Sequence, residues 1–137
     1  MTVRIVESLV KGKTPSLHKT WVPISSISEN LVAGAVVSED ARFFEHYGFD
    51  FEAIQKAMKH NSKAKRIRGG STISQQVAKN VFLWPTRSYI RKALEAVFTV
   101  MIEAVWSKQR IMEVYLNIVE LGDGVYGVEA ASQLFFH

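Results

Sequence analysis

The sequence predicts an all-α domain, and three observations support this. Apolar residues recur at helical spacing through successive segments, Pro and Gly residues separate those segments, and no stretch alternates apolar and polar residues as a half-buried strand does. The chain has 137 residues, of which 47% are hydrophobic, so it can bury one substantial core. It has no cysteine, which excludes disulfide bonds and thiolate metal sites.

We expect the chain to divide into an N-terminal lead-in segment, residues 1–26, and a single domain, residues 27–137. Within the lead-in, residues 1–10 can form a short amphipathic helix, followed by a loop with glycine and proline. Ser28 is the predicted N-cap of a helix over residues 29–38. The predicted buried face of this helix consists of Leu31, Val32, Ala35 and Val36.

A second helix is predicted over residues 51–60, with Asp50 as its N-cap. Its predicted inward positions are Phe51, Ile54, Ala57 and Met58. Residues 61–70 follow as a polar, basic stretch that ends in two glycines, which predicts a mobile surface loop.

Four further helices are predicted in the C-terminal half. Pro85 ends a helix over residues 71–83, and Thr86 or Arg87 begins the next, which runs to about Trp106. The last two predicted helices cover residues 107–117, with Ser107 as cap, and residues 127–136, after a glycine-rich tight turn. Because the apolar residues just before His137 need partners, we expect the natural domain to continue and this sequence to be truncated at its C-terminal end.

Two adjacent carboxylates, Glu39 and Asp40, follow the apolar helix over residues 29–38. Adjacent acids repel each other and are costly to desolvate, so folding alone gives little reason for this position. A catalytic carboxylate is one explanation, and a polar helix end that leads into an aromatic-anchored loop is the other. For Asp40, the sequence leaves open a turn cap, a pair with Arg42 and a pair with a residue of the basic segment.

Basic residues are concentrated between Ala53 and Leu94. This stretch has ten Lys or Arg residues and no Asp or Glu, whereas the rest of the chain has seven basic and thirteen acidic residues. Such a block indicates a polyanionic partner, either nucleic acid, anionic lipid head groups or a phosphate-bearing substrate, with a solvated surface as the alternative. The aromatic residues are not interleaved with the basic ones, which disfavours nucleic acid.

The helix over residues 71–83 has one face of uncharged or basic hydrogen-bonding residues, namely Ser71, Thr72, Gln75, Gln76, Lys79 and Asn80. Thr72 and Gln75 also have the spacing of a capping box. Such a face suits sugar hydroxyls, amides or phosphates, and a plain polar helix surface is the alternative.

The helix that ends near Trp106 is apolar over most of its circumference, which predicts a core helix. Its narrow polar stripe, which we expect to be partly enclosed or to line a cleft, consists of Arg91, Lys92, Glu95, Thr99 and Glu103. Glu95 is therefore a second candidate carboxylate, although a salt bridge with Arg91 would also explain it. Two acids in different environments suit chemistry at an anomeric carbon, and nearby bases could neutralise a phosphate leaving group. The four histidines are scattered, so no histidine metal site is predicted.

These residues stand in five ordered blocks that resemble those of the peptidoglycan glycosyltransferases of glycosyltransferase family 51. The blocks are Glu39-Asp40-x-x-Phe43-x-x-His46-x-Gly48, Gly69 to Asn80 (with Ser74 where Thr is more usual), Arg91-Lys92-x-x-Glu95, Ser107 to Asn117, and Gly122 to Ala131. The segment Phe82-Leu83-Trp84 and the short link to Arg91 are similar to the monofunctional biosynthetic type, and a fragment of a bifunctional penicillin-binding protein would look similar. The resemblance, from about Ile27 to His137, implies a lysozyme-like helical fold.

The resemblance implies polymerisation of lipid II into a glycan chain through β-1,4 links, with inversion and release of undecaprenyl pyrophosphate. Glu39 would be the general base, and Glu95 would assist on the donor side. Ser71, Gln75 and Gln76 would position sugar and phosphate oxygens, and Lys79, Arg87 and Lys92 would hold the pyrophosphate. A divalent cation, Mg²⁺ or Mn²⁺, at the pyrophosphate is left open.

The same resemblance implies lipid II, the lipid-linked glycan chain and the membrane surface as partners, without nucleic acid. It leaves other cell-wall synthesis proteins open as partners. The expected location is the outer face of the bacterial cytoplasmic membrane, with an anchor outside this sequence. The alternative enzyme is a lysozyme-like hydrolase or lytic transglycosylase. It explains the basic block less well, because cleavage of glycan releases no pyrophosphate.

Overall fold

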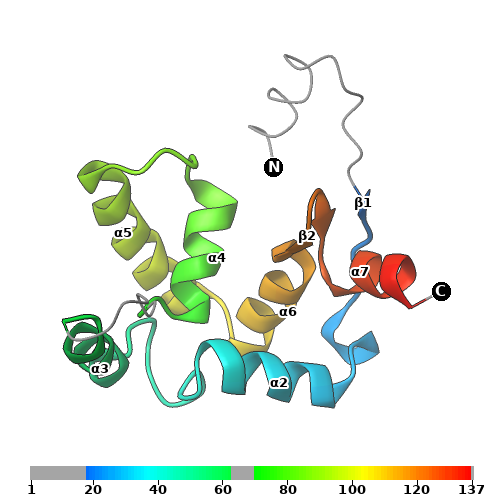
Figure 1. Cartoon of the computed structure of the whole chain (residues 1–137), viewed down its shortest axis with the longest axis horizontal. Helices are drawn as coiled ribbons and strands as arrows, with labels where there is room; N and C mark the ends of the chain where they lie inside the picture. The colour runs from blue at the N-terminus through cyan, green and yellow to red at the C-terminus, as the bar shows by residue number, and fades with distance from the viewer. Residues whose placement is uncertain (1–17, 63–69, 137) are drawn as a thin grey trace.

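The computed structural model describes residues 18–62 and 70–136. The predicted helix over residues 1–10 and most of the predicted loop over residues 61–70 lie outside the described residues. The described part contains six α-helices and one small sheet (Figure 1). The helices are α2 (Glu29–Glu39), α3 (Phe51–Asn61), α4 (Ile73–Phe82), α5 (Tyr89–Val105), α6 (Lys108–Ile118) and α7 (Val128–Phe135).

The helices begin close to where their capping residues predict. Asp50 accepts a hydrogen bond from the Ala53 backbone N–H at 2.9 Å, and Ser107 accepts one from Arg110 at 3.2 Å. The capping box at the start of α4 is present in full. The predicted start of α5 at Thr86 or Arg87 is wrong by two or three residues, because Ser88 supplies the cap.

The prediction of an all-α chain is wrong in one respect, because a three-stranded sheet lies beside α7. Its strands are β1 (His18–Lys19), β2 (Glu120–Gly122) and β3 (Val125–Tyr126), in the order β1-β3-β2. β1 runs parallel to β3, and β2 pairs with β3 as an antiparallel hairpin where a tight turn was predicted. Strands of two or three residues are too short to show alternation in the sequence.

α4 lies at the centre of the helical body, between α5 and α6 (Figure 1). Its buried residues join a continuous apolar core with the loop after α2 and with α5 and α6. The fully buried members of this core include Phe43, Ile73, Val77, Ile111 and Met112. The sequence predicts Ile111, Val114, Tyr115 and Ile118 as the inner face of α6; the first three are buried, and Ile118 is half-buried.

The buried residues of α5 are Arg91, Glu95, Thr99 and Ile102. The prediction that its polar stripe is partly enclosed is therefore confirmed. The apolar side chains on its other side are exposed, namely Tyr89, Ile90, Val97, Val100, Met101 and Val105. The prediction of a core helix is therefore wrong for this outer face. The stripe tolerates burial because its charged groups are paired with one another.

The predicted inner faces of α2 and α3 are only partly correct. Leu31 on α2 is exposed, and no residue of α2 is fully buried, because the helix packs along one edge of the body. On α3, Ala57 is buried as predicted, but Phe51 and Met58 are 76% and 68% exposed. Short helices at an edge bury only a narrow line of residues, which a helical wheel does not reveal.

Asn117 at the end of α6 fastens the segment before α2 to the core. Its side-chain amide accepts from the Val22 backbone N–H and donates to the Val22 carbonyl, both at 2.8 Å. Glu113, one turn earlier, accepts from the Ile24 N–H at 3.0 Å. The division of the chain at residue 26 stays a prediction, but residues 22–24 are joined to α6 by these bonds.

Close packing at Asn117 also explains Gly127. Gly127 has a φ of +86°, and a Cβ there would lie 2.8 Å from the Asn117 carbonyl oxygen. Only glycine fits both the backbone conformation and the space. The turn into α7 therefore depends on the same residue that holds the segment before α2.

We expect Asn117→Ala to lower the free energy of unfolding by about 3 kcal/mol, because it removes a fully buried side chain and leaves the half-buried backbone N–H and carbonyl of Val22 unpaired. Urea denaturation measures this. As a control, Gln133→Ala on the exposed side of α7 should cost less than about 0.5 kcal/mol. Equal losses in the two variants would contradict the role of Asn117.

Candidate active site

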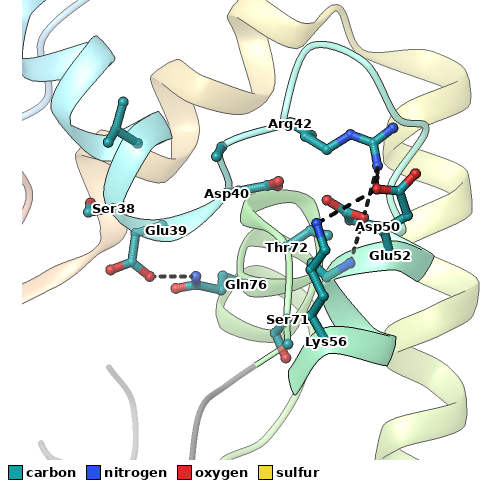
Figure 2. Close-up of a pocket in the computed structure, with 14 residues that line it drawn as sticks. Ser38, Glu39, Asp40, Arg42, Asp50, Glu52, Lys56, Ser71, Thr72 and Gln76 are labelled. Atoms are coloured by element: carbon teal, nitrogen blue, oxygen red, sulfur yellow. Dashed lines mark hydrogen bonds and ion pairs between the residues drawn. The ribbon is translucent and has the colours of Figure 1, made fainter. Parts of the chain in front are cut away.

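A cavity of about 480 Å³ lies where the end of α2, the start of α3 and the start of α4 meet (Figure 2). Its charged lining consists of Glu39, Asp40, Arg42, Asp50, Glu52 and Lys56. Four of these six side chains are acids, so the cavity suits a neutral, hydroxyl-bearing group better than an anion. Gly70, Ser71, Thr72 and Gln76 complete the wall on the side of α4.

Glu39 is the last residue of α2, and its carboxylate is exposed to the cavity. Its Oε2 accepts a hydrogen bond from Gln76 Nε2 at 3.0 Å (Figure 2). The structure therefore brings together three of the residues that the sequence places in the site, Glu39, Ser71 and Gln76. A solvated carboxylate beside a cavity can accept a proton from a bound hydroxyl group.

Asp40, in contrast, is buried, and its carboxylate joins two segments. Its oxygens lie 2.9 and 3.0 Å from His46 Nε2, and Oδ2 also accepts the backbone N–H of Ile73 at 3.0 Å. The proposed pair with Arg42 is wrong, because Arg42 binds Glu45 and Glu52 instead. Asp40 thus stabilises the N-terminus of α4, where a negative charge is favourable.

Two further contacts hold the loop after α2 against α4 and α5. Thr72 Oγ1 donates to the Gly48 carbonyl at 2.6 Å. Gly48 has a φ of +88°, and a Cβ there would lie 2.7 Å from the Thr99 methyl group. The loop can approach both helices this closely only because the residue is glycine.

Sequence reasoning missed the wall of the cavity opposite Glu39. There, Arg42 Nη1 lies 2.8 Å from Glu52 Oε2 and 3.7 Å from Asp50 Oδ1, while Lys56 Nζ is 3.9 Å from Glu52 (Figure 2). The spacing of Glu52 and Lys56 places them on one face of α3, which was the available signal. Nothing in the sequence showed that this face would meet the end of α2.

The remaining predicted site residues do not line the cavity. Gln75 is buried, and its Oε1 accepts the Thr72 N–H at 2.9 Å within the capping box. Lys79 is half-buried three residues beyond Gln76, and Arg87 is exposed in the link before α5. Neither cation is part of the cavity lining.

Glu95 lies inside the α4–α5 interface, with its side chain 4% exposed. Lys92 Nζ is 2.5 Å from one carboxylate oxygen, and Arg91 Nη1 is 3.8 Å from the other. The alternative of a salt bridge between Arg91 and Glu95 is thus confirmed. Glu95 also binds Lys92, whose side chain is exposed at the surface.

Comparison with known proteins decides the family. The model of the transglycosylase family matches residues 7–137. The chain belongs to the transglycosylase family. It is 57% identical to the biosynthetic peptidoglycan transglycosylase of Bdellovibrio bacteriovorus and 56% identical to that of Caulobacter vibrioides, each over 136 residues and 99% of this chain. The corresponding protein of Bacteroides thetaiotaomicron is 54% identical over 137 residues, the whole chain.

The chain spans 54% to 58% of the length of these three curated relatives. Among the described residues of this chain, no helix is long and apolar enough to cross a membrane. Nor do three or more His, Asp or Glu side chains of that part lie close enough together to hold a metal ion.

Tyr115 of the transglycosylase fold is a further residue whose charge state depends on Glu39. Burial, and secondly the negative charge of Glu39, raises the pKa of Tyr115 to about 12. The phenol is therefore neutral at physiological pH. It can donate a proton in a hydrogen bond, but it cannot act as a base.

Tyr115 also predicts how stability changes with alkaline pH. Because its pKa is raised in the folded state, the folded protein binds more protons than the unfolded chain between pH 10 and about 12. Its contribution to stability is therefore complete below pH 10 and is lost as the pH rises toward 12. We expect wild type to lose about 1 kcal/mol more over this window than Tyr115→Phe, as measured by urea midpoints.

The control for this measurement is Tyr47→Phe, because Tyr47 is 84% exposed. This variant should follow wild type across the same window. A Tyr115→Phe curve parallel to that of wild type would refute the effect.

Proposed function

We propose that the protein polymerises peptidoglycan glycan chains from lipid II, with Glu39 as the general base. Glu39 takes the proton of the acceptor 4-hydroxyl group, and that oxygen attacks the anomeric carbon of the lipid-linked chain. The bond from this carbon to the pyrophosphate oxygen breaks, undecaprenyl pyrophosphate leaves with the electron pair, and the configuration inverts. The observation that carries the proposal is the exposed Glu39 carboxylate at a cavity suited to hydroxyl groups, in a chain of the transglycosylase family.

The cations of α4 and α5 are proposed to receive the leaving group. Three cations can reach the surface: Arg87 and Lys92 are exposed, and Lys79 is half-buried. Their charges can therefore contact a pyrophosphate. Ser71 and Gln75 stay in the proposal as positioning residues, Ser71 by direct contact and Gln75 through the capping box that shapes the helix start.

A divalent cation at this place fits the described residues poorly. Glu95 is the candidate carboxylate, but its oxygens already face Lys92 and Arg91. A magnesium ion would have to compete with these two fixed positive charges. We therefore assign charge neutralisation to the basic side chains and propose that Glu95 positions Lys92.

We also propose that the exposed outer face of α5 contacts the membrane that carries the lipid substrate. The face consists of Tyr89, Ile90, Val97, Val100, Met101 and Val105. The side chains of both acids of this helix, Glu95 and Glu103, are at least 94% buried, whereas Lys92 is exposed near its start. An apolar face with aromatic and basic residues at one end is typical of helices that lie on anionic lipid. This contact would place the protein in the cell envelope, at the outer face of the cytoplasmic membrane.

Glu39→Gln should slow polymerisation of purified lipid II at least about 100-fold, because a general base contributes that much or more. Gel separation of labelled glycan chains measures the rate. Glu29→Gln is the matched control, since Glu29 is exposed at the other end of α2 and does not line the cavity. Near wild-type polymerisation by Glu39→Gln would contradict the assignment of Glu39 as general base. Release of soluble fragments from purified cell wall would favour the hydrolase.

Val100→Asp should weaken binding to phosphatidylglycerol vesicles at least about tenfold, because a charge then replaces an inserted side chain. Vesicle co-sedimentation measures this. Leu134→Asp on α7 introduces the same charge at an exposed apolar residue elsewhere and should bind like wild type. Equal weakening in both variants would argue against the α5 face.

A further inference from the structure

The side chain of Gln76 is directed at Glu39. Its Nε2 lies 3.0 Å from Glu39 Oε2, and Figure 2 shows the two side chains meeting at one side of the cavity. The sequence assigns Gln76 to the substrate, together with its neighbours on the polar face of α4. In the structure, the amide donor of Gln76 is already engaged by the carboxylate.

Buried hydrogen bonds of neighbouring residues hold the backbone on both sides of this contact. Asp40, the residue after Glu39, accepts the Ile73 N–H at 3.0 Å, and Ile73 begins the helix that carries Gln76. The backbone N–H of Gln76 donates to the Thr72 carbonyl, and Thr72 is bonded to Gly48. The end of α2 and the first turn of α4 therefore keep a fixed separation.

This geometry restricts how the Glu39 carboxylate can rotate. Gln76 donates to one oxygen, Oε2, and among the described residues no hydrogen bond to the other oxygen is found. An amide N–H stabilises the ionised carboxylate and cannot itself accept a proton from the substrate. One oxygen is thus anchored, and the other remains available to a hydroxyl group in the cavity.

We propose that Gln76 is a positioning residue for Glu39, which orients the carboxylate and favours its ionised form. The proposal rests on the assignment of Glu39 as general base. It differs from substrate binding, because Gln76 then acts through Glu39 and affects the rate of the chemical step. A residue that only bound substrate would chiefly affect KM.

The test compares Gln76→Ala and Gln76→Glu with wild type in lipid II polymerisation across pH. Gln76→Ala should lower kcat about tenfold or more, change KM less than about twofold, and move the acidic limb of the kcat profile to higher pH. Gln76→Glu should move that limb further, because it places a second carboxylate beside Glu39. Gln55→Ala on the exposed side of α3 is the matched control and should follow wild type.

The other charged or titratable groups around Glu39 are the same in wild type and in these variants. They therefore do not account for a difference in the acidic limb of the kcat profile. These groups are Asp40, Arg42, Asp50, Glu52, Lys56, Lys79 and Tyr115. A rise in KM with an unmoved acidic limb would overturn the proposal in favour of substrate binding. Unchanged kcat and an unmoved limb would overturn it as well.

A second measurement separates this proposal from the assignment of the base. Carbon-13 labelling of glutamate side chains allows the titration of the Glu39 carboxyl group to be followed by NMR without substrate. The titration should move to higher pH in Gln76→Ala, whether or not Glu39 proves to be the base. An unmoved titration overturns the role of Gln76, whereas full activity of Glu39→Gln overturns only the assignment of the base.

Discussion

The buried carboxylate of Asp40 is the interaction on which the site depends. It holds His46 within its own loop and the first backbone N–H of α4 from across the body. A charge buried in this way is stable only because both of its oxygens are hydrogen-bonded. Its position fixes Glu39, the preceding residue, against α4 and leaves that carboxylate exposed at the cavity. The two adjacent acids therefore differ in their surroundings, because Asp40 is buried and joins two segments, whereas Glu39 is exposed at the cavity.

α5 shows how polar residues can form an interior while apolar residues face outward. The acids of its charged stripe are paired: Glu95 meets Arg91 and Lys92 of the same helix, and Glu103 binds Lys108 of α6 at 2.8 Å and also Ser74 of α4. Breaking one member of such a set leaves a buried charge unpaired, which is strongly destabilising. The apolar side is thereby left exposed, and the amino group of Lys92, near the start of the helix, is exposed as well.

The motif over residues 107–117 serves the fold and only indirectly the site. Glu113 and Asn117 fasten residues 22–24, Lys108 neutralises Glu103, and Tyr115 is buried within reach of the charge of Glu39. Motif residues are often assumed to touch substrate. Here no residue of α6 lines the cavity, and α6 instead packs in the apolar core with residues of α4.

The sequence by itself determined the approximate extent of α2 to α7, the caps at Asp50, Thr72 and Ser107, and the two candidate carboxylates, because capping and helical periodicity act between residues at most four positions apart. It also carried the five blocks that mark the family. Only the tertiary structure decided that Asp40 binds His46 and Ile73, that Gln76 meets Glu39, that Arg42, Glu52 and Lys56 form the opposite wall, and that the apolar side of α5 is exposed. Most of these contacts join residues more than four positions apart, and the exposure of α5 depends on which helices pack against it, so both are set by packing, which no local spacing encodes.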